Sequence, residues 1–551
     1  MKKCTILFLM LMFMSIVVAQ TPDWLWAQSA GGTNHDHGYA VAVDNNGNTY
    51  VTGWFDGTVT FGSTTISSAS SGDRDIFVAK LDPEGNWLWA KGAGGTDEDF
   101  GMDIAVDNNG NVYVTGRFWQ TALFGNITLT NHGWTDLFVA KLDSNGNWLW
   151  AKSAGGTGPE SGEGITVDDL SNVYLTGSFQ GTATFGTIQL TSDGNSDIFI
   201  AKLDTNGNWL WAKRAGGECG AYGEDIAVDS TGNVYLTGYF GGWELGIISI
   251  GSTTLTSVGW TDIFVAKLNS SGSWLWAKGA GGLSSDYSRG IAVDSAGSVY
   301  LTGSFGDWGG GDSSFGSFEL TGEGMEDIFV AKLDSDGNWV WAKQAGGENG
   351  DHSMDIAVDS ADNIYLAGYF GMSEENTSTF GTISLVCSGQ SDAFVAKLDS
   401  SGNWLWAQRG GGINSEACES IAVDNSGSVY LTGSFGDWGG IASSFGTHAL
   451  NSNGISDIFV AKLGSSGSNP IPKFPQNLLI QRNGLNVIIS WNPVTEDTNN
   501  QPLTPDAYKI EISENNSDWS DLVTLTAIQY SYTDTTLNPD SKFYRVIAVK
   551  N

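Results

Sequence analysis

Cysteine, proline and basic residues are scarce in this chain of 551 residues, and each scarcity excludes a class of protein. Four cysteines are too few for a disulfide scaffold, so packing must hold the fold. With 25 basic against 61 acidic residues, the formal charge of −36 argues against nucleic acid or anionic lipid as a partner. Beyond residue 19 no apolar run is long enough to cross a bilayer, so membrane insertion of the mature chain is not expected.

The first 19 residues are typical of a cleavable signal peptide. Lys2 and Lys3 precede the apolar run "ILFLMLMFMSIVV", which ends at the small residue Ala19. We therefore expect a signal peptide over residues 1–19 and a mature protein outside the cytoplasm, either secreted or on the cell surface.

Three motifs recur seven times each along the rest of the chain. "WLWA" or "WVWA" returns every 61 to 65 residues, and the other two are typified by "DIFVAKL" and "IAVDSTGNVYLTG". Tight turns rich in Asn, Asp, Ser and Gly join β-branched and aromatic runs, which is the pattern of β-hairpins. Four antiparallel strands repeating at this period predict the blades of an all-β propeller.

The first "WLWA", at residues 24–27, has no "DIFVAKL" before it, and the last "DIFVAKL", at residues 457–463, has no "WLWA" after it. The repeat is thus out of phase by one strand. We expect the N-terminal strand to complete the last blade, so that the two ends of the domain are hydrogen-bonded together.

"GNVYLTGSF" followed by "DIFVAKL" and "GNWLWAK" resembles the bacterial seven-bladed β-propeller repeat family of secreted and surface proteins. The resemblance implies a propeller over residues 20–466 and no particular reaction. After a linker at residues 467–473, the segment 474–551 resembles a fibronectin type III domain, a small β-sandwich, in the order "ISW", "YKIEIS", "LNP" and "FYRVIAV".

One column of acidic residues recurs between "AGG" and "IAVD". It consists of Asp36, Asp99, Glu160, Asp286, Asp351 and Glu416, with Ala221 in the remaining repeat. Because this segment enters the innermost strand, the column is a candidate acidic ring at one mouth of the central channel, able to hold Ca²⁺ or a cationic group. The alternative is that each carboxylate caps backbone amides in its own blade.

The links from "VYLTG" to "DIFVAKL" are long and differ between repeats, and alternating strand direction puts them on the same face as the acidic column. They carry aromatic and acidic residues suited to a sugar or a protein surface. The candidate ligand-binding residues are Trp54, Trp119, Trp243, Asp307, Trp308, Asp437 and Trp438. The alternative is that these rings fold inward and plug the loops.

Cys387 and Cys418 map to this same face and form a candidate disulfide. Taken together, the sequence favours a non-catalytic scaffold that binds a glycan or a protein through its long-loop face, with no cofactor except, as a candidate, Ca²⁺. The competing interpretation is a glycan hydrolase or lyase that uses acidic residues at the channel mouth. Acids with raised pKa in a pocket of residues unique to one blade would favour catalysis.

Overall fold

The computed structural model describes residues 21–70, 72–242, 246–306, 311–371, 373, 375–436 and 442–464, together with six strands between residues 479 and 549. The predicted signal peptide (1–19) and linker (467–473) lie outside the described residues. The chain divides into two compact units, Met1–Gly464 and Ser465–Asn551. None of the described residues is helical, and none forms a helix able to cross a membrane.

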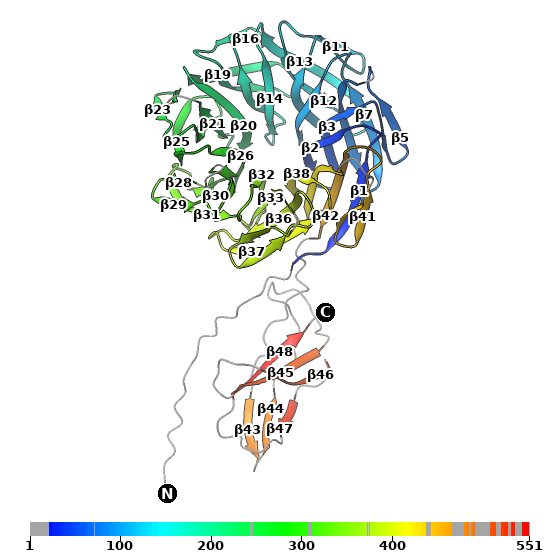
Figure 1. Ribbon diagram of the computed structural model, residues 1–551, viewed down its shortest axis with the longest axis vertical. Helices are drawn as coiled ribbons and strands as arrows, with labels where there is room; N and C mark the ends of the chain where they lie inside the picture. The colour runs from blue at the N-terminus through cyan, green and yellow to red at the C-terminus, as the bar shows by residue number, and fades with distance from the viewer. Residues whose placement is uncertain are drawn as a thin grey trace. The chain divides into compact units, whose positions relative to one another are not determined.

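The first unit is a seven-bladed β-propeller, whose blades are arranged in a ring (Figure 1). In each blade four antiparallel strands run from the axis outward. The innermost strands of blades 1 to 7 are β2 (Asp36–Val43), β8 (Phe100–Val106), β14 (Glu160–Val167), β20 (Gly220–Val228), β26 (Tyr287–Val293), β32 (Asp351–Val358) and β38 (Glu416–Val423). The second strands are β3 (Thr49–Asp56), β9 (Val112–Phe118), β15 (Val173–Phe179), β21 (Val234–Gly241), β27 (Val299–Phe305), β33 (Ile364–Phe370) and β39 (Val429–Phe435).

The "DIFVAKL" and "WLWA" motifs form the two outer strands of each blade. The third strands are β6 (Arg74–Leu81), β12 (Asp136–Leu142), β18 (Asp197–Leu203), β24 (Thr261–Leu268), β30 (Asp327–Leu333), β36 (Asp392–Leu398) and β42 (Asp457–Leu463). The outermost strands are β7 (Trp87–Ala93), β13 (Trp148–Gly156), β19 (Trp209–Gly217), β25 (Trp274–Gly282), β31 (Trp339–Ala345), β37 (Trp404–Gly410) and, in blade 7, β1 (Trp24–Ala30).

The N-terminal strand closes the ring as the repeat phase predicts. β1 pairs antiparallel with β42, from Trp24 opposite Leu463 to Ala30 opposite Ile458, and the sheet order is β1-β42-β39-β38. Blade 7 is therefore built from both ends of the propeller, which leaves no blade incomplete.

Each repeat also holds a two-stranded hairpin that the sequence prediction of four strands missed. The hairpins are β4–β5 (Thr58–Phe61, Thr64–Ser67), β10–β11 (Thr121–Phe124, Ile127–Thr130), β16–β17 (Thr182–Phe185, Ile188–Thr191), β22–β23 (Ile247–Ile250, Thr253–Thr256), β28–β29 (Asp312–Phe315, Phe318–Thr321), β34–β35 (Thr377–Phe380, Ile383–Val386) and β40–β41 (Ala442–Phe445, His448–Asn451). They occupy the links that were expected to be variable loops. Each described repeat therefore contributes six strands rather than four.

Every hairpin pairs with the outermost strand of the preceding blade. Gly155 and Gly156 of β13 pair with β16, and Gly31, directly after β1, bridges to Thr60 of β4 in the same way. This contact explains the second glycine of the "AGG" motif, because a Cβ at Gly95 would lie 1.9 Å from the Thr121 carbonyl oxygen.

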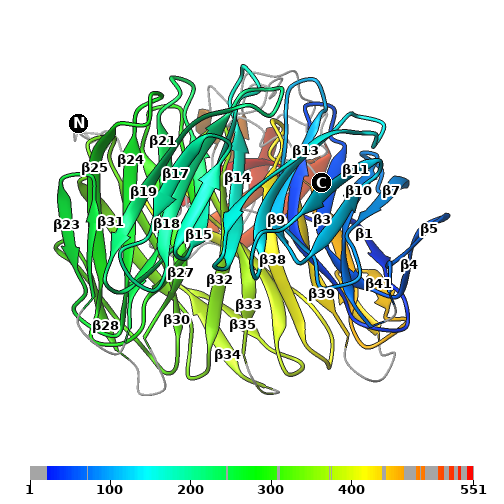
Figure 2. The ribbon, with the colours of Figure 1, turned by 90° about the horizontal axis from the view of Figure 1, so that it is seen from above.

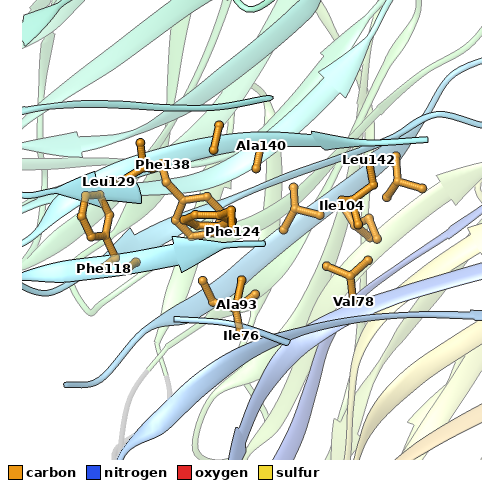
Figure 3. Close-up of a cluster of buried hydrophobic side chains, with 14 of the residues drawn as sticks. Ile76, Val78, Ala93, Ile104, Phe118, Phe124, Leu129, Phe138, Ala140 and Leu142 are labelled. Atoms are coloured by element: carbon orange, nitrogen blue, oxygen red, sulfur yellow. The ribbon is translucent and has the colours of Figure 1, made fainter. Parts of the chain in front are cut away.

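The apolar cores lie between neighbouring blades rather than within them. In Figure 3, Ile76 and Val78 of blade 1 pack with Phe124 and Phe138 of blade 2, and these side chains are fully buried. The second tryptophan of the repeated pair joins blades too, since Trp89 Nε1 donates to the Ser144 carbonyl oxygen in the next blade at 3.2 Å. These tryptophans therefore join neighbouring blades.

The short turns gather at one end of the ring, here called the turn end, and the hairpin links lie at the other, the link end (Figure 2). One arrangement recurs at the turn end of every blade. In blade 2, Asp107 Oδ1 accepts the Asn109 and Asn111 amides, the Tyr113 hydroxyl donates to Asp107 Oδ2, and the Lys141 ammonium lies 4.7 Å from the Tyr113 ring centre. The repeated lysines are structural.

The second unit contains two three-stranded antiparallel sheets. Their orders are β43-β44-β47 and β46-β45-β48. The strands are β43 (Leu479–Asn483), β44 (Asn486–Ser490), β45 (Ala507–Ser513), β46 (Ser520–Thr526), β47 (Ser531–Asp534) and β48 (Phe543–Val549). Tyr508 and Ile510 are fully buried. The fibronectin-like sandwich stays a prediction.

Candidate functional site

A cavity of about 770 Å³ opens at the link end of the propeller, around its axis. All seven innermost strands contribute to its wall, and blades 2 and 3 add residues from their links, including Trp134 and Ser196. Its size falls within the range of small-ligand sites in proteins, which is about 300–1,000 Å³.

A β-bulge in every innermost strand supplies one residue to this wall. The pairing of each innermost strand with the second strand skips one residue at the same place in each blade. A bulge leaves its extra residue outside the ladder and re-aims it. The bulge residues, in blade order, are Tyr39, Met102, Glu163, Glu224, Arg289, Met354 and Glu419, and all seven line the cavity.

The bulge column differs in chemistry from blade to blade, and the sequence analysis did not single it out. Only one signal was available, namely a position three residues after the acidic column that holds Tyr, Met, Glu or Arg, two residues before a column in which Ile or Val recurs in every repeat. Positions that build the ring are the same in all blades. A varying column that converges on one cavity is therefore where a ligand would be recognised.

Two ion pairs and one histidine–carboxylate contact hold the charged side chains at the cavity. Arg289 Nη1 lies 2.7 Å from Glu224 Oε2, Arg117 Nη1 lies 3.9 Å from Glu163 Oε1, and His37 Nε2 lies 3.3 Å from Glu419 Oε1. Burial raises the pKa of the Glu224 carboxyl, while the positive charge of Arg289 opposes the rise.

Aromatic rings surround the cavity, but unevenly. Facing residues of the innermost and second strands form ring pairs in three blades: His37 with Trp54, Tyr222 with Tyr239, and His352 with Tyr369, with centres 5.9, 5.0 and 4.9 Å apart. In blade 3 the facing residues are Ser161 and Ser178. Blade 3 therefore has small side chains where blades 1, 4 and 6 place ring pairs. Blade 7 has small ones too, Ala417 and Ser434, but only those of blade 3 line the cavity.

Below the bulges, aspartates on alternate blades tie the innermost strands together. Asp103 Oδ2 accepts the Ile165 amide of blade 3 at 2.7 Å, and Asp225 and Asp355 make the same bond to blades 5 and 7. Burial raises the pKa of Asp103 to about 8, and repulsion from Asp355 adds to the rise. These carboxyls link blades, as their hydrogen bonds show.

The structure describes two of the seven predicted ligand-binding residues. Trp119 is half-buried and lines the cavity. Trp54 is 8% exposed, lies in the stack with His37, and is covered by the Arg74 guanidinium at 4.4 Å from its ring centre, so it is a packed side chain rather than an open platform, and it does not line the cavity. Trp243, Asp307, Trp308, Asp437 and Trp438 lie outside the described residues.

The acidic column does not line a channel mouth as a free ring. All six of its carboxyl-bearing residues are fully buried at the junctions between blades. Asp99 Oδ2 accepts the Gly95 amide at 2.7 Å and Asp99 Oδ1 accepts the Trp119 amide at 3.0 Å. The alternative interpretation, local capping of backbone amides, is the one these contacts fit.

Each carboxyl of the column meets a second carboxyl from the first residue of the preceding "DIFVAKL" strand. A Cβ at Gly94 would touch both Asp75 and Asp99, at 2.3 and 2.9 Å from their oxygens. Burial raises the pKa of Asp99 to about 8, the Trp119 amide opposes the rise and the charge of Asp75 adds to it. Ionising both carboxyls of such a buried pair is unfavourable because the two negative charges repel each other. The pair therefore holds a proton near neutral pH.

The seventh junction, between blades 3 and 4, lacks the second carboxyl and balances its buried charge in another way. Ala221 replaces the acidic residue there, and Asp197 instead pairs with Arg214, whose Nη1 lies 3.0 Å from Asp197 Oδ2. Where no second carboxyl is present to share a proton, a guanidinium balances the buried charge.

The candidate disulfide between Cys387 and Cys418 does not form. Cys219, Cys387 and Cys418 are all free thiols. Cys387 packs in the apolar core between blades 5 and 6 and Cys418 in the core between blades 6 and 7. The disulfide was predicted because both cysteines map to one face of the ring. This was not sufficient, because each cysteine is buried in a different core between blades. Among the described residues no group of three or more His, Cys, Asp or Glu side chains is placed to hold a metal ion.

Comparison with known proteins agrees with the architecture. A family described as β-propeller repeat matches residues 89–117, 210–239 and 276–304. An uncharacterized WD repeat-containing protein of Acanthamoeba polyphaga mimivirus is 27% identical over 506 residues, covering 75% of this chain and 36% of the relative. The regulatory protein FlaEY of Caulobacter vibrioides is 26% identical over 353 residues, covering 59% of this chain and 35% of the relative. This chain thus spans about a third of either relative.

Solved structures show weaker likeness. The WD40 β-propeller domain of Doa1 is 10% identical with a TM-score of 0.35, and the match covers 79% of this chain and 96% of that one. A puromycin hydrolase is 9% identical with a TM-score of 0.36, covering 88% and 64%. The chain carries β-propeller repeats, and they form a seven-bladed propeller.

Proposed function

We propose that this protein is a non-catalytic binding scaffold that holds its ligand, a glycan or a protein, in the cavity at the link end of the propeller. One observation carries the proposal: the bulge column, in which all seven blades direct a side chain to one place and the column varies among Tyr, Met, Glu and Arg. A propeller with a WD-repeat relative is consistent with such a role. The role requires no cofactor.

We further propose that the mature chain acts outside the cytoplasm, secreted or held on the cell surface of a bacterium. The signal-peptide pattern of residues 1–19 and the formal charge of −36, suited to a solvated surface, support this location. Cell fractionation tests it, with the chain expected in the envelope or the medium.

Hydrogen exchange of the full chain tests the site. Envelope polysaccharide and envelope protein fractions are added separately, and amide protection is mapped by mass spectrometry. Protection is expected in residues 99–103, 158–163 and 222–225, around the cavity, and none is expected in the turns 44–48 and 82–86 at the opposite end. Protection confined to those turns would contradict the proposal.

A glycan hydrolase or lyase is the second candidate, and one observation favours it. Glu224 combines a raised pKa with a place in the cavity wall, as a general acid would require. Its 2.7 Å contact with Arg289 favours the ionised form and so argues for a structural role. Release of reducing ends or unsaturated products from the polysaccharide fraction would establish the enzyme instead.

A further inference from the structure

Blades 2 and 3 contribute a distinct set of aromatic and polar side chains to the cavity wall. Here the facing positions hold Ser161 and Ser178, both at the cavity wall, where blades 4 and 6 have the ring pairs Tyr222–Tyr239 and His352–Tyr369. Ser178 is half-buried and Ser161 is 8% exposed. The small side chains leave a notch, defined by Arg117, Trp119, Trp134, Glu160, Ser161 and Ser178.

Two tryptophans of blade 2 flank the notch. Trp119 follows β9 directly, and other repeats have Asp, Gln or Gly at the same position. Trp134 precedes β12 by two residues and is 75% exposed, which is unusual for so large an apolar ring. Both rings line the cavity, so the notch has aromatic walls that no other blade reproduces.

Three polar atoms of the residues lining the notch have no hydrogen-bond partner among the described residues. They are Arg117 Nε, Glu160 Oε1 and Ser161 Oγ. Glu160 is fully buried. Unpartnered buried atoms also occur at other blade junctions, for example Asp75 Oδ1 and Asp327 Oδ1, but among the described residues only these three belong to side chains that line the cavity. The three supply a guanidinium donor, a carboxyl oxygen and a hydroxyl that both donates and accepts.

A sugar ring combines the two properties that would match aromatic walls and polar atoms. Its C–H faces are apolar and flat enough to lie against an indole, and its edge carries hydroxyls that both donate and accept. A protein partner would instead need about 800 Å² of matching surface, much more than one recessed notch offers. The cavity of about 770 Å³ has room for a short oligosaccharide.

We propose that the notch between blades 2 and 3 is a carbohydrate-binding subsite, with Trp119 and Trp134 against the sugar faces and Arg117, Glu160 and Ser161 bonded to its hydroxyls. The proposal rests on the proposed function and names the ligand class of the same cavity. The carboxyl of Glu160 accepts the Gly156 amide through Oε2 at 3.0 Å, which fixes Oε1 in place for a ligand.

The full chain is screened against an array of neutral, uronic and amino-sugar oligosaccharides, and each hit is titrated by calorimetry. Trp134→Ala is expected to weaken binding about tenfold or more, as removal of a central aromatic contact does. The matched control is Trp260→Ala. Trp260 stands in the same "GWTD" sequence two repeats later, is 52% exposed, and does not line the cavity. The control should bind like the parent chain.

A second variant fills the notch without removing any predicted contact. Ser178→Tyr introduces the residue that blades 4 and 6 carry in the same column, so the fold tolerates it, and an unchanged thermal midpoint verifies this. It is expected to abolish binding of the same oligosaccharide.

Two results would overturn the inference. Equal binding by the parent, Trp134→Ala and Ser178→Tyr would show that sugars bind elsewhere. No binding to any oligosaccharide would remove carbohydrate as the ligand class. In that case, protection of the cavity by the protein fraction in hydrogen exchange would leave the proposed function standing, whereas protection confined to the opposite end would end both.

Discussion

The two ends of the propeller follow different rules. At the turn end, an aspartate, a buried tyrosine and a lysine recur in all seven blades with nearly the same geometry, the lysine ammonium lying 4.6 to 4.8 Å from the tyrosine ring centre. At the link end, the bulge column and the facing ring columns change from blade to blade. Repetition marks the residues that build the ring, and variation marks those that are free to recognise a ligand.

The most direct test of this difference between repeated and varying positions uses two tyrosines of one strand, β33. Tyr365 belongs to the repeated turn-end column and is 1% exposed, while Tyr369 belongs to the varying column and is half-buried. Tyr365→Ala should cost about 3–5 kcal/mol of unfolding free energy because it opens a cavity in the core. Tyr369→Ser, which introduces the residue of blades 3, 5 and 7, should cost about 1 kcal/mol.

Denaturant titration of both variants measures the difference. Equal losses would mean that the varying column also holds the ring together, and its assignment to recognition would fail.

The junction between blades 3 and 4 offers the next largest effect. Arg214→Met leaves the fully buried Asp197 without its ion-pair partner and should cost about 1–3 kcal/mol. Arg409→Met removes the equivalent contact to Asp392, but there Glu416 can still share a proton. The second loss should therefore be smaller, as chemical denaturation of the two variants would show. A larger loss for Arg409→Met would contradict proton sharing.

The two ends should also respond to pH in opposite directions. Burial raises the pKa of junction carboxyls, to about 8 for Asp99 and about 7 for Glu416, so the folded state binds more protons than the unfolded state between about pH 4 and pH 8. Stability should fall as pH rises through this window. At the turn end, burial is outweighed by amide hydrogen bonds that lower the pKa of Asp107 and Asp359, so their contribution is lost as pH falls below about 4.

Glu416→Gln isolates one junction. The amide cannot ionise, so the variant should lose less stability than the parent between pH 5 and pH 8.5, by up to about 1 kcal/mol per pKa unit removed from the linkage. Thermal midpoints across this range give the slope. An identical slope in both proteins would show that this carboxyl does not titrate in the folded state.

Thiol chemistry should give the smallest effect. Because Cys387 and Cys418 are free and buried, a reducing agent should leave the thermal midpoint unchanged, and thiol reagents should label the half-buried Cys219 first. A midpoint that falls on reduction would revive the disulfide.

The sequence predicted the architecture more fully than the site, for a physical reason. Period, turn residues and the unmatched "WLWA" at Trp24 report strand order, which repeats encode locally. The bulge at Tyr39 and its six counterparts, the hairpin bridge from Gly94 to Leu123, and the pairing of Asp75 with Asp99 all depend on contacts between different strands or blades. Such contacts leave no mark in the spacing, so the acidic column was assigned to the wrong surroundings.

The antiparallel pairing of β1 with β42 also means that these two strands can pair only after nearly the whole propeller has been synthesised. β1 is made near the start and its partner near the end of the propeller. At a synthesis rate of about 5–20 residues per second, the edge of β1 that pairs with β42 stays without its partner for roughly 20–90 s. The strand carries Trp24 and Trp26, so throughout this interval an unpaired strand edge with apolar side chains is exposed and can associate with other chains. The last blade is consequently the point at which this protein is most open to misassembly, and a factor that shields the newly made N-terminal strand would raise its yield.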